Sequence, residues 1–260
     1  MARKKKPSLI SRVTFKILRF FFKLFYKRTN IEGIENIPKS NTVIVANHAQ
    51  LNGPIIAELY MPENYYIWAN GQMVRCRDVP AYAMEDFFPY KSKWTRPVYK
   101  LVSYILALLL PCVINNARAI LVYRDARIVS TFKTTMRRLT EGNNIVIFPE
   151  CHKRCNNIVN EFQENFIDIA RLYYKRTGIE LTFVPMYIAP KMGKAYVGTP
   201  TRFDSSCDIT EERSRIAEYL SEEITRLGRS LPEHVVVPFD NISEKDYISN
   251  KSFDLIPGEN

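Results

Sequence analysis

Short apolar runs alternate with longer amphipathic stretches along most of this chain. The runs are predicted to be strands: 42–48, 65–69, 119–124, 144–150, 181–189, 195–203 and 234–239. Helical periodicity is found between them, in 125–141, 160–175 and 209–227. Gly142 is a stop signal for the first of these helices, and Asp208 is an N-cap for the last. The alternation predicts an α/β layered domain with a mixed or largely parallel sheet, whose functional sites gather at strand carboxyl ends.

The first 28 residues follow a different pattern. Basic side chains recur every three or four residues on one stripe of a predicted helix: Arg12, Lys16, Arg19, Lys23 and Lys27. The opposite face is apolar and rich in phenylalanine. A basic residue in every turn excludes a signal peptide and a transmembrane span. The pattern favours a helix lying on anionic lipid, with a helix packed on its own protein as the alternative. We therefore expect a membrane-interfacial helix in 1–28 and the α/β domain in 29–260.

A second apolar stretch covers 101–114, LVSYILALLLPCVI, and contains Pro111. It is short for a membrane span, and a helix buried in the protein is the usual explanation for such a run. A shallow membrane insertion and one wall of a hydrophobic binding groove are the alternatives that the sequence leaves open.

Charge and cysteine content narrow the classes of protein further. The chain of 260 residues has a net charge of +10, and ten of its 37 basic residues lie in 1–28, where there is no acidic residue. The remaining 27 Lys and Arg match the 27 Asp and Glu. A neutral body with one basic arm argues against a nucleic-acid partner and for an anionic membrane. Five scattered cysteines without a CxxC pair indicate a reducing compartment, and the CHKRC segment has too few further ligands to predict a metal site.

Three polar residues follow predicted strands: His48, Arg124 and Glu150. Each has an ordinary structural explanation by itself, as a turn residue, a solvated strand end and a helix start. Because strand carboxyl ends share one edge of a parallel sheet, we expect the three side chains to open on one cleft. The alternative for Arg124 is a purely structural ion pair with Asp125 or Glu150.

These residues lie in segments that resemble the ordered sequence blocks of the glycerolipid acyltransferase family. The segments are NHAQLNGP with His48, ILVYRD with Arg124, FPECHK with Glu150 and FVPMYI with Pro185. The resemblance covers about residues 30–205 and implies the layered α/β fold of that family, with an insertion between the first two blocks. The chain departs from the pattern at Gly53, where the family has an aspartate, and at Cys151, His152 and Lys153 in the third block.

The resemblance implies an O-acyl transfer. His48 would take a proton from the acceptor hydroxyl while that oxygen attacks an acyl thioester, because the pKa of histidine lies near working pH. Arg124 and Lys153 would bind the acceptor phosphate, and Glu150 would hold its glycerol hydroxyls or brace the arginine. Asn47, Gln50 and Gly53 would lie beside the substrate. No metal or cofactor is implied; acyl-CoA or acyl carrier protein is the co-substrate.

The missing aspartate leaves the orientation of the His48 ring open. Gln50 or Asn52 could hold the ring by a hydrogen bond, or a distant acid such as Glu58, Glu85 or Asp125 could fold against it. A further hypothesis is that the Gly53–Pro54 turn brings backbone N–H groups to an oxyanion. His152 is a less favoured replacement base.

The sequence thus predicts a peripheral protein on the cytoplasmic face of a membrane, where it acylates a lysophosphatidate-like acceptor in phospholipid biosynthesis. A non-catalytic member of the same fold that binds phospholipid or acyl chains is the second hypothesis. An unrelated α/β protein tethered by its basic arm is the third.

Overall fold

The computed structural model describes residues 7–89 and 92–252. The chain divides into two compact units. The first comprises Met1–Lys27 and Ile67–Thr134, and the second comprises Arg28–Tyr66 and Thr135–Asn260. The chain passes between them after Lys27, again within β3 (Tyr65–Asn70) and a third time within α5 (Ile128–Thr140).

The second unit is built on a mixed sheet of α/β type, as predicted. Its strands pair in the order β1-β9-β8-β2-β5, with β10 added to β8. Their bounds are β1 Asn30–Glu32, β2 Thr42–Ala46, β5 Asn144–Ile147, β8 Thr182–Ala189, β9 Lys194–Val197 and β10 Thr201–Arg202. The pairs β2–β5, β2–β8 and β1–β9 are parallel, whereas β8–β9 and β10–β8 are antiparallel. The carboxyl ends of β2 and β5 therefore lie next to each other.

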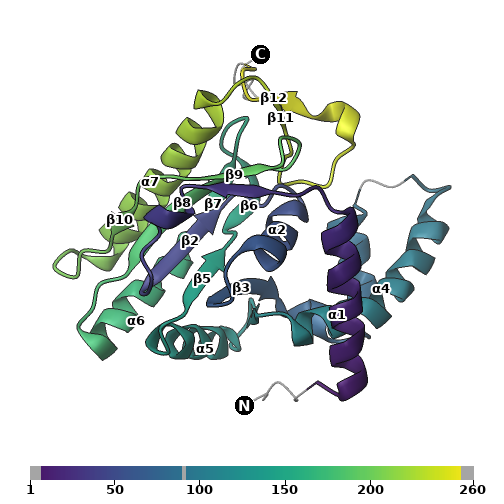
Figure 1. Ribbon diagram of the computed structural model, residues 1–260, viewed down its shortest axis with the longest axis horizontal. Helices are drawn as coiled ribbons and strands as arrows, with labels where there is room; N and C mark the ends of the chain where they lie inside the picture. Colours follow the sequence, from purple (N-terminus) through teal and green to yellow (C-terminus); the bar gives the residue numbers. More distant parts are fainter. Residues whose placement is uncertain (1–6, 90–91, 253–260) are drawn as a thin grey trace. The chain divides into compact units, whose positions relative to one another are not determined.

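The core of this unit is centred on the two middle strands. All five residues of β2 are buried, as are all residues of β8 after Thr182. Continuous apolar strands of this kind are expected where a sheet is covered on both faces. The long helix α7 (Ile209–Ser230) packs against β8 (Figure 1). The other helices are α2 (Asn52–Tyr60) and α6 (Asp168–Thr177), with short 3₁₀ turns at Ile34–Asn36, Glu164–Ile167 and Glu244–Asp246.

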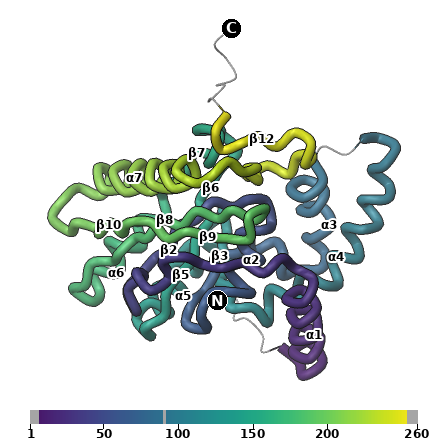
Figure 2. The backbone as a smooth tube through the Cα atoms, turned by 45° about the horizontal axis from the view of Figure 1, so that its top comes forward, coloured from purple at the N-terminus to yellow at the C-terminus, as the bar shows by residue number. Residues whose placement is uncertain are grey.

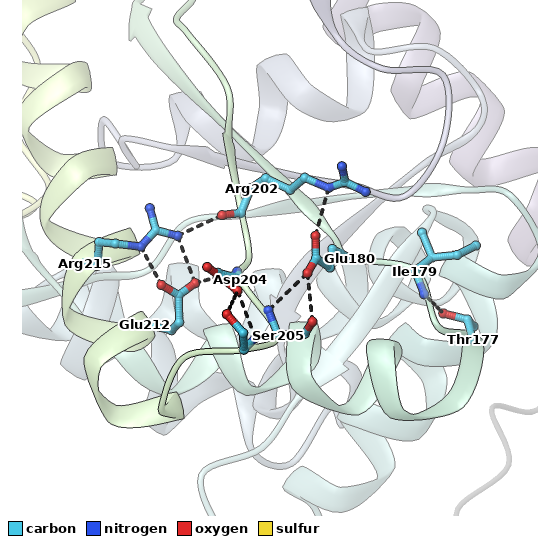
Figure 3. A network of polar contacts seen from close by, with 9 residues as sticks. Thr177, Ile179, Glu180, Arg202, Asp204, Ser205, Glu212 and Arg215 are labelled. Atoms are coloured by element: carbon cyan, nitrogen blue, oxygen red, sulfur yellow. Dashed lines mark hydrogen bonds and ion pairs between the residues drawn. The ribbon is translucent and has the colours of Figure 1, made fainter.

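A polar network fixes the start of α7 (Figure 3). Asp208 caps the helix by accepting a hydrogen bond from the Thr210 N–H at 2.7 Å, as predicted. Glu212 is buried, pairs with Arg215 and accepts the Asp204 N–H at 2.8 Å. Burial opposes ionisation of Glu212, but these hydrogen bonds hold its pKa below the ordinary value. The network ties the segment after β10 to the helix.

Two small hairpins complete the second unit: β6 (Glu150–Arg154) with β7 (Asn160–Phe162), and β11 (Val235–Val236) with β12 (Ile248–Ser249). The prediction of a helix over 160–175 is therefore wrong at its start. Residues 160–162 form β7 because they pair with β6. The helix α6 begins only at Asp168 and ends at Thr177, and the next residue, Gly178, adopts the left-handed conformation that commonly ends a helix. A pairing with a neighbouring strand is invisible in a local pattern.

The first unit contains α1 (Leu9–Phe25), the parallel pair β3–β4 (β4 is Ala119–Val122) and α4 (Arg96–Asn116). Shorter elements precede α4: a 3₁₀ turn at Gly71–Val74, α3 at Val79–Tyr82 and a π-helical turn at Ala83–Phe87. Within this unit α3 packs on α4 (Figure 2).

The apolar stretch 101–114 is the middle of α4, and its usual explanation as a buried helix is wrong. Only Ser103, Ala107 and Pro111 of α4 are buried. By length and composition α4 could cross a membrane, and within the described ranges it is the one helix of this kind. Only 17% of its most apolar stretch is buried.

Candidate active site around His48

His48 lies just beyond the carboxyl end of β2, in a tight turn that leads into α2. The two residues after it, Ala49 and Gln50, adopt left-handed backbone conformations with φ of 47° and 56°. This region is uncommon for residues other than glycine. It turns the main chain back, so that the Gln50 carbonyl oxygen meets the Nδ1 atom of the half-buried His48 ring.

That contact settles which nitrogen of a neutral His48 carries the proton. A carbonyl oxygen only accepts hydrogen bonds, so Nδ1 must be the donor, and the lone pair of the ring is then on Nε2. This is the tautomer that a general base needs. The main-chain carbonyl of Gln50 therefore orients the ring; a contact from the Asn52 side chain or from a distant carboxylate stays a prediction.

Gly53 is a glycine because the turn leaves no room for a side chain. A Cβ atom at this position would lie 2.6 Å from the His48 carbonyl oxygen and 2.7 Å from Cε1 of Phe148. The Gly53 N–H donates to the His48 carbonyl at 2.9 Å, so this N–H is engaged inside the turn. An aspartate at position 53 does not fit this backbone unless the turn moves.

Glu150 holds the His48 turn from the β6–β7 hairpin. It is the first residue of β6, and its carboxylate accepts the main-chain N–H of His48 on one oxygen and that of Asn160, at 2.9 Å, on the other. The side chain is buried, and desolvation raises the pKa of Glu150 to about 7, with the nearby charge of Asp240 acting in the same direction. In this structure Glu150 acts as a brace between β2 and the β6–β7 hairpin.

Aromatic rings and a second histidine surround the His48 imidazole. Phe148 and Phe239 both meet it edge to face, with ring centroids at 5.4 and 5.5 Å. Phe239 also contacts the ring of His152 at 5.1 Å, and His152 Nδ1 is 2.9 Å from an Asp240 oxygen. His152 is an exposed side chain in this pair. Phe148 lies within the predicted FPE segment, whereas Phe239 and Asp240 had no signal in the sequence.

Two of the residues predicted to lie beside the substrate form hydrogen bonds with the main chain of other segments. Asn47 is buried, and its amide joins β2 to β8: Nδ2 donates to the Ile188 carbonyl at 3.0 Å, and Oδ1 accepts the Ile188 N–H at 2.6 Å. The Gln50 amide donates to the carbonyl oxygens of Asp240, at 3.0 Å, and Ile242, at 3.3 Å. Both contacts hold the ends of the His48 turn, and substrate contacts at these residues stay a prediction.

The two predicted phosphate ligands lie in different units. Lys153, on β6, pairs with Glu161 of β7 at 2.7 Å, and this contact raises the pKa of Lys153. Arg124 follows β4 in the first unit. The neighbouring Asp125 pairs with Arg127 at 2.7 Å. The structure thus brings His48 and Glu150 together in one unit, and the convergence of Arg124 with them stays a prediction.

In residues 7–89 and 92–252, no cluster of three or more His, Cys, Asp or Glu side chains is placed to hold a metal ion. Around His48 the structure places a carbonyl oxygen on Nδ1, two aromatic rings and a buried carboxyl that accepts the His48 N–H, an arrangement in which an imidazole would suit acid–base chemistry.

Comparison with known proteins finds a distant structural similarity. Scans against protein-family models and curated proteins found no match. Among solved structures, the chain is similar to the crystal structure of the 1-acyl-sn-glycerophosphate (LPA) acyltransferase PlsC from Thermotoga maritima. The two chains are 19% identical, the alignment covers 87% of this chain and 83% of that chain, and the TM-score is 0.45. A likeness this distant does not transfer an activity, so the function is argued from the site.

Proposed function

We propose that this protein is a peripheral membrane acyltransferase that moves a fatty acyl group from a thioester to the hydroxyl of a lysophosphatidate-like acceptor. The single observation that carries the proposal is the His48 turn, in which a main-chain carbonyl fixes the tautomer of an imidazole enclosed by Phe148 and Phe239. The donor is acyl-CoA or acyl carrier protein, and the work is done on the cytoplasmic face of an anionic membrane, in phospholipid biosynthesis.

The chemistry requires one base. Nε2 of His48 accepts the hydroxyl proton as the acceptor oxygen attacks the thioester carbonyl, and the resulting tetrahedral oxyanion collapses to the ester. The leaving thiolate then takes the proton from His48 and departs as a thiol. A general base placed in this way contributes about 10²–10⁴ in rate.

The Gln50 carbonyl replaces only part of what a carboxylate supplies. In the serine-protease triad, exchanging the aspartate for asparagine lowers the turnover about 10⁴-fold because the histidine adopts the wrong tautomer. The carbonyl of Gln50 keeps the correct tautomer, but it is neutral and stabilises the imidazolium less than a carboxylate would. We therefore expect a slow but genuine transferase.

The amphipathic helix α1 supports the membrane part of the proposal. None of its residues is buried, and the exposed Phe21, Leu24 and Phe25 lie on a different face from the basic stripe. A helix of this composition gains from burying its apolar face in lipid and from about 1 kcal/mol per basic residue near an anionic surface.

The test is a transfer assay with purified full-length protein, lysophosphatidic acid and radiolabelled acyl-CoA or acyl carrier protein. Formation of the diacyl product should fall by about 10²–10⁴ in His48→Ala. The matched control is His152→Ala, which removes the neighbouring exposed histidine and should retain at least a tenth of the wild-type rate. If wild type and His48→Ala are equally inert with both donors while lipid still binds, the protein is a non-catalytic binder of phospholipid.

A further inference from the structure

The helix α4 presents an apolar face that its own unit does not cover. Six large side chains of this face are exposed by 38–74%: Val98, Leu101, Tyr104, Ile105, Leu108 and Leu109. The buried residues Ser103, Ala107 and Pro111 follow one another every fourth position on the opposite side, where the helix packs on the short elements that precede it. Trp94, two residues before the helix, is 93% exposed. Soluble surfaces rarely leave such a continuous patch in water.

The charge around this face identifies its partner. From residue 87 to residue 124 the sequence has no acidic side chain. Beside the first turns of α4, a groove of about 830 Å³ is lined by the basic side chains Arg77, Lys93, Arg96 and Lys100, together with apolar ones such as Met84 and Tyr104. A basic groove next to an apolar, tryptophan-flanked helix face matches phosphate head groups above acyl chains.

We propose that α4, with Trp94 and the basic groove, is a docking surface for an anionic phospholipid bilayer, in which the helix lies flat in the interface. This surface is additional to α1, and it does not depend on the proposed acyl transfer. The two helices pack together within one unit through Ser11, Cys112 and Asn116. Together they would form one lipid-facing layer, so the membrane contact would be wider than α1 alone.

The packing of α4 favours an interfacial position over a spanning one. One side of the helix is covered by the segment 71–87, which includes Arg75, Arg77 and Asp78. If α4 crossed the hydrocarbon core, these charged residues would have to enter it as well, at several kcal/mol each. A helix lying in the interface keeps them in water while it buries its exposed face.

The first test measures the partition of the full-length protein onto vesicles of phosphatidylcholine mixed with phosphatidylglycerol. Leu101→Glu combined with Leu108→Glu should lower the partition coefficient at least about 100-fold, since burying each leucine contributes about 1.5–3 kcal/mol. The control combines Val129→Glu with Ile179→Glu, which adds the same charge at exposed apolar positions outside the patch. It should lower binding less than about tenfold. Equal binding by the two double variants would overturn the proposal.

The second test does not depend on the stability of those variants. In a Trp68→Phe protein, Trp94 is the remaining tryptophan, and its emission should shift to the blue and be quenched by shallow brominated lipid. Pure phosphatidylcholine vesicles should give a weaker effect. An unchanged spectrum with the anionic vesicles would refute the docking surface.

Depth separates a flat helix from a spanning one. Leu108→Trp, in a chain that also carries Trp68→Phe and Trp94→Phe, places the probe about 18 Å along the helix from Arg96. A flat α4 gives quenching at the same shallow depth as Trp94, whereas quenching near the bilayer centre would contradict the interfacial orientation. Neither readout uses the transfer reaction, so the docking surface and the proposed activity can fail separately.

Discussion

An aspartate introduced at position 53 should damage this protein rather than activate it. In Gly53→Asp the new Cβ would lie 2.6 Å from the His48 carbonyl oxygen and 2.7 Å from the Phe148 ring. The carbonyl cannot yield without moving the turn, because it also accepts the Gly53 N–H. Overpacking of this kind costs about 1–3 kcal/mol, and the carboxylate adds repulsion against the same carbonyl.

The assay is urea unfolding followed by circular dichroism, together with the acyl-transfer rate. A loss of about 1–3 kcal/mol, at an m value of about 2–3 kcal/mol/M, lowers the urea midpoint by about 0.3–1.5 M. The transfer rate should fall with it, because the Gln50 carbonyl is displaced from His48 when the turn moves.

Two comparisons isolate the steric cause. Gly53→Ala introduces the same Cβ contact without a charge and should lose stability in the same range. Gly142→Asp adds the identical side chain at an exposed glycine with φ +80°, where nothing lies within 4 Å of a Cβ. It should change stability by at most about 1 kcal/mol, because aspartate tolerates the left-handed region. A Gly53→Asp protein as stable as wild type, with faster transfer, would refute this reasoning.

Two further predictions concern buried carboxyls. Because the pKa of Glu150 is raised from 4.5 to about 7, its contribution to stability is complete below pH 4.5 and is lost as the pH rises through 7, about 3 kcal/mol in all. Glu150→Gln should abolish that pH dependence in denaturation curves recorded from pH 4.5 to 8, and an unaltered curve would contradict the assignment. The pKa of Glu212 is lowered, so its contribution is present above the ordinary carboxyl range and lost in acid. Glu212→Gln should therefore cost about 1–3 kcal/mol at pH 7 and progressively less as the pH falls below 4; a constant difference would exclude the ionised pair with Arg215.

The strands of the sheet were predictable from sequence because burial on both faces leaves a direct trace. The apolar residues 43–46 of the first predicted strand and nearly all of 181–189 lie in β2 and β8 at the centre of the sheet. The start of α6 was not predictable, because residues 160–162 take their conformation from pairing with β6. The exposure of α4 was left open for a related reason: composition shows that a segment is apolar, but not what covers it.

The group that orients His48 was beyond sequence reasoning for a different reason. Every residue has a carbonyl oxygen, so the sequence cannot mark the one at Gln50 as special. The left-handed conformations of Ala49 and Gln50 also leave no trace, since neither is a glycine. The one visible sign was Gly53, which looks like the loss of a catalytic acid but is required by the close approach of the His48 carbonyl.

The use of a main-chain carbonyl makes the geometry of the base depend on the whole turn. A side-chain carboxylate reaches an imidazole through its own rotatable bonds, whereas the direction of a main-chain carbonyl is set by the backbone dihedrals of the turn. The turn is accordingly held at both ends, by Glu150 on the His48 N–H and by the Gln50 amide on the segment around Asp240. Both contacts hold the main chain of the turn, so the direction from which the Gln50 carbonyl meets the His48 ring depends on them.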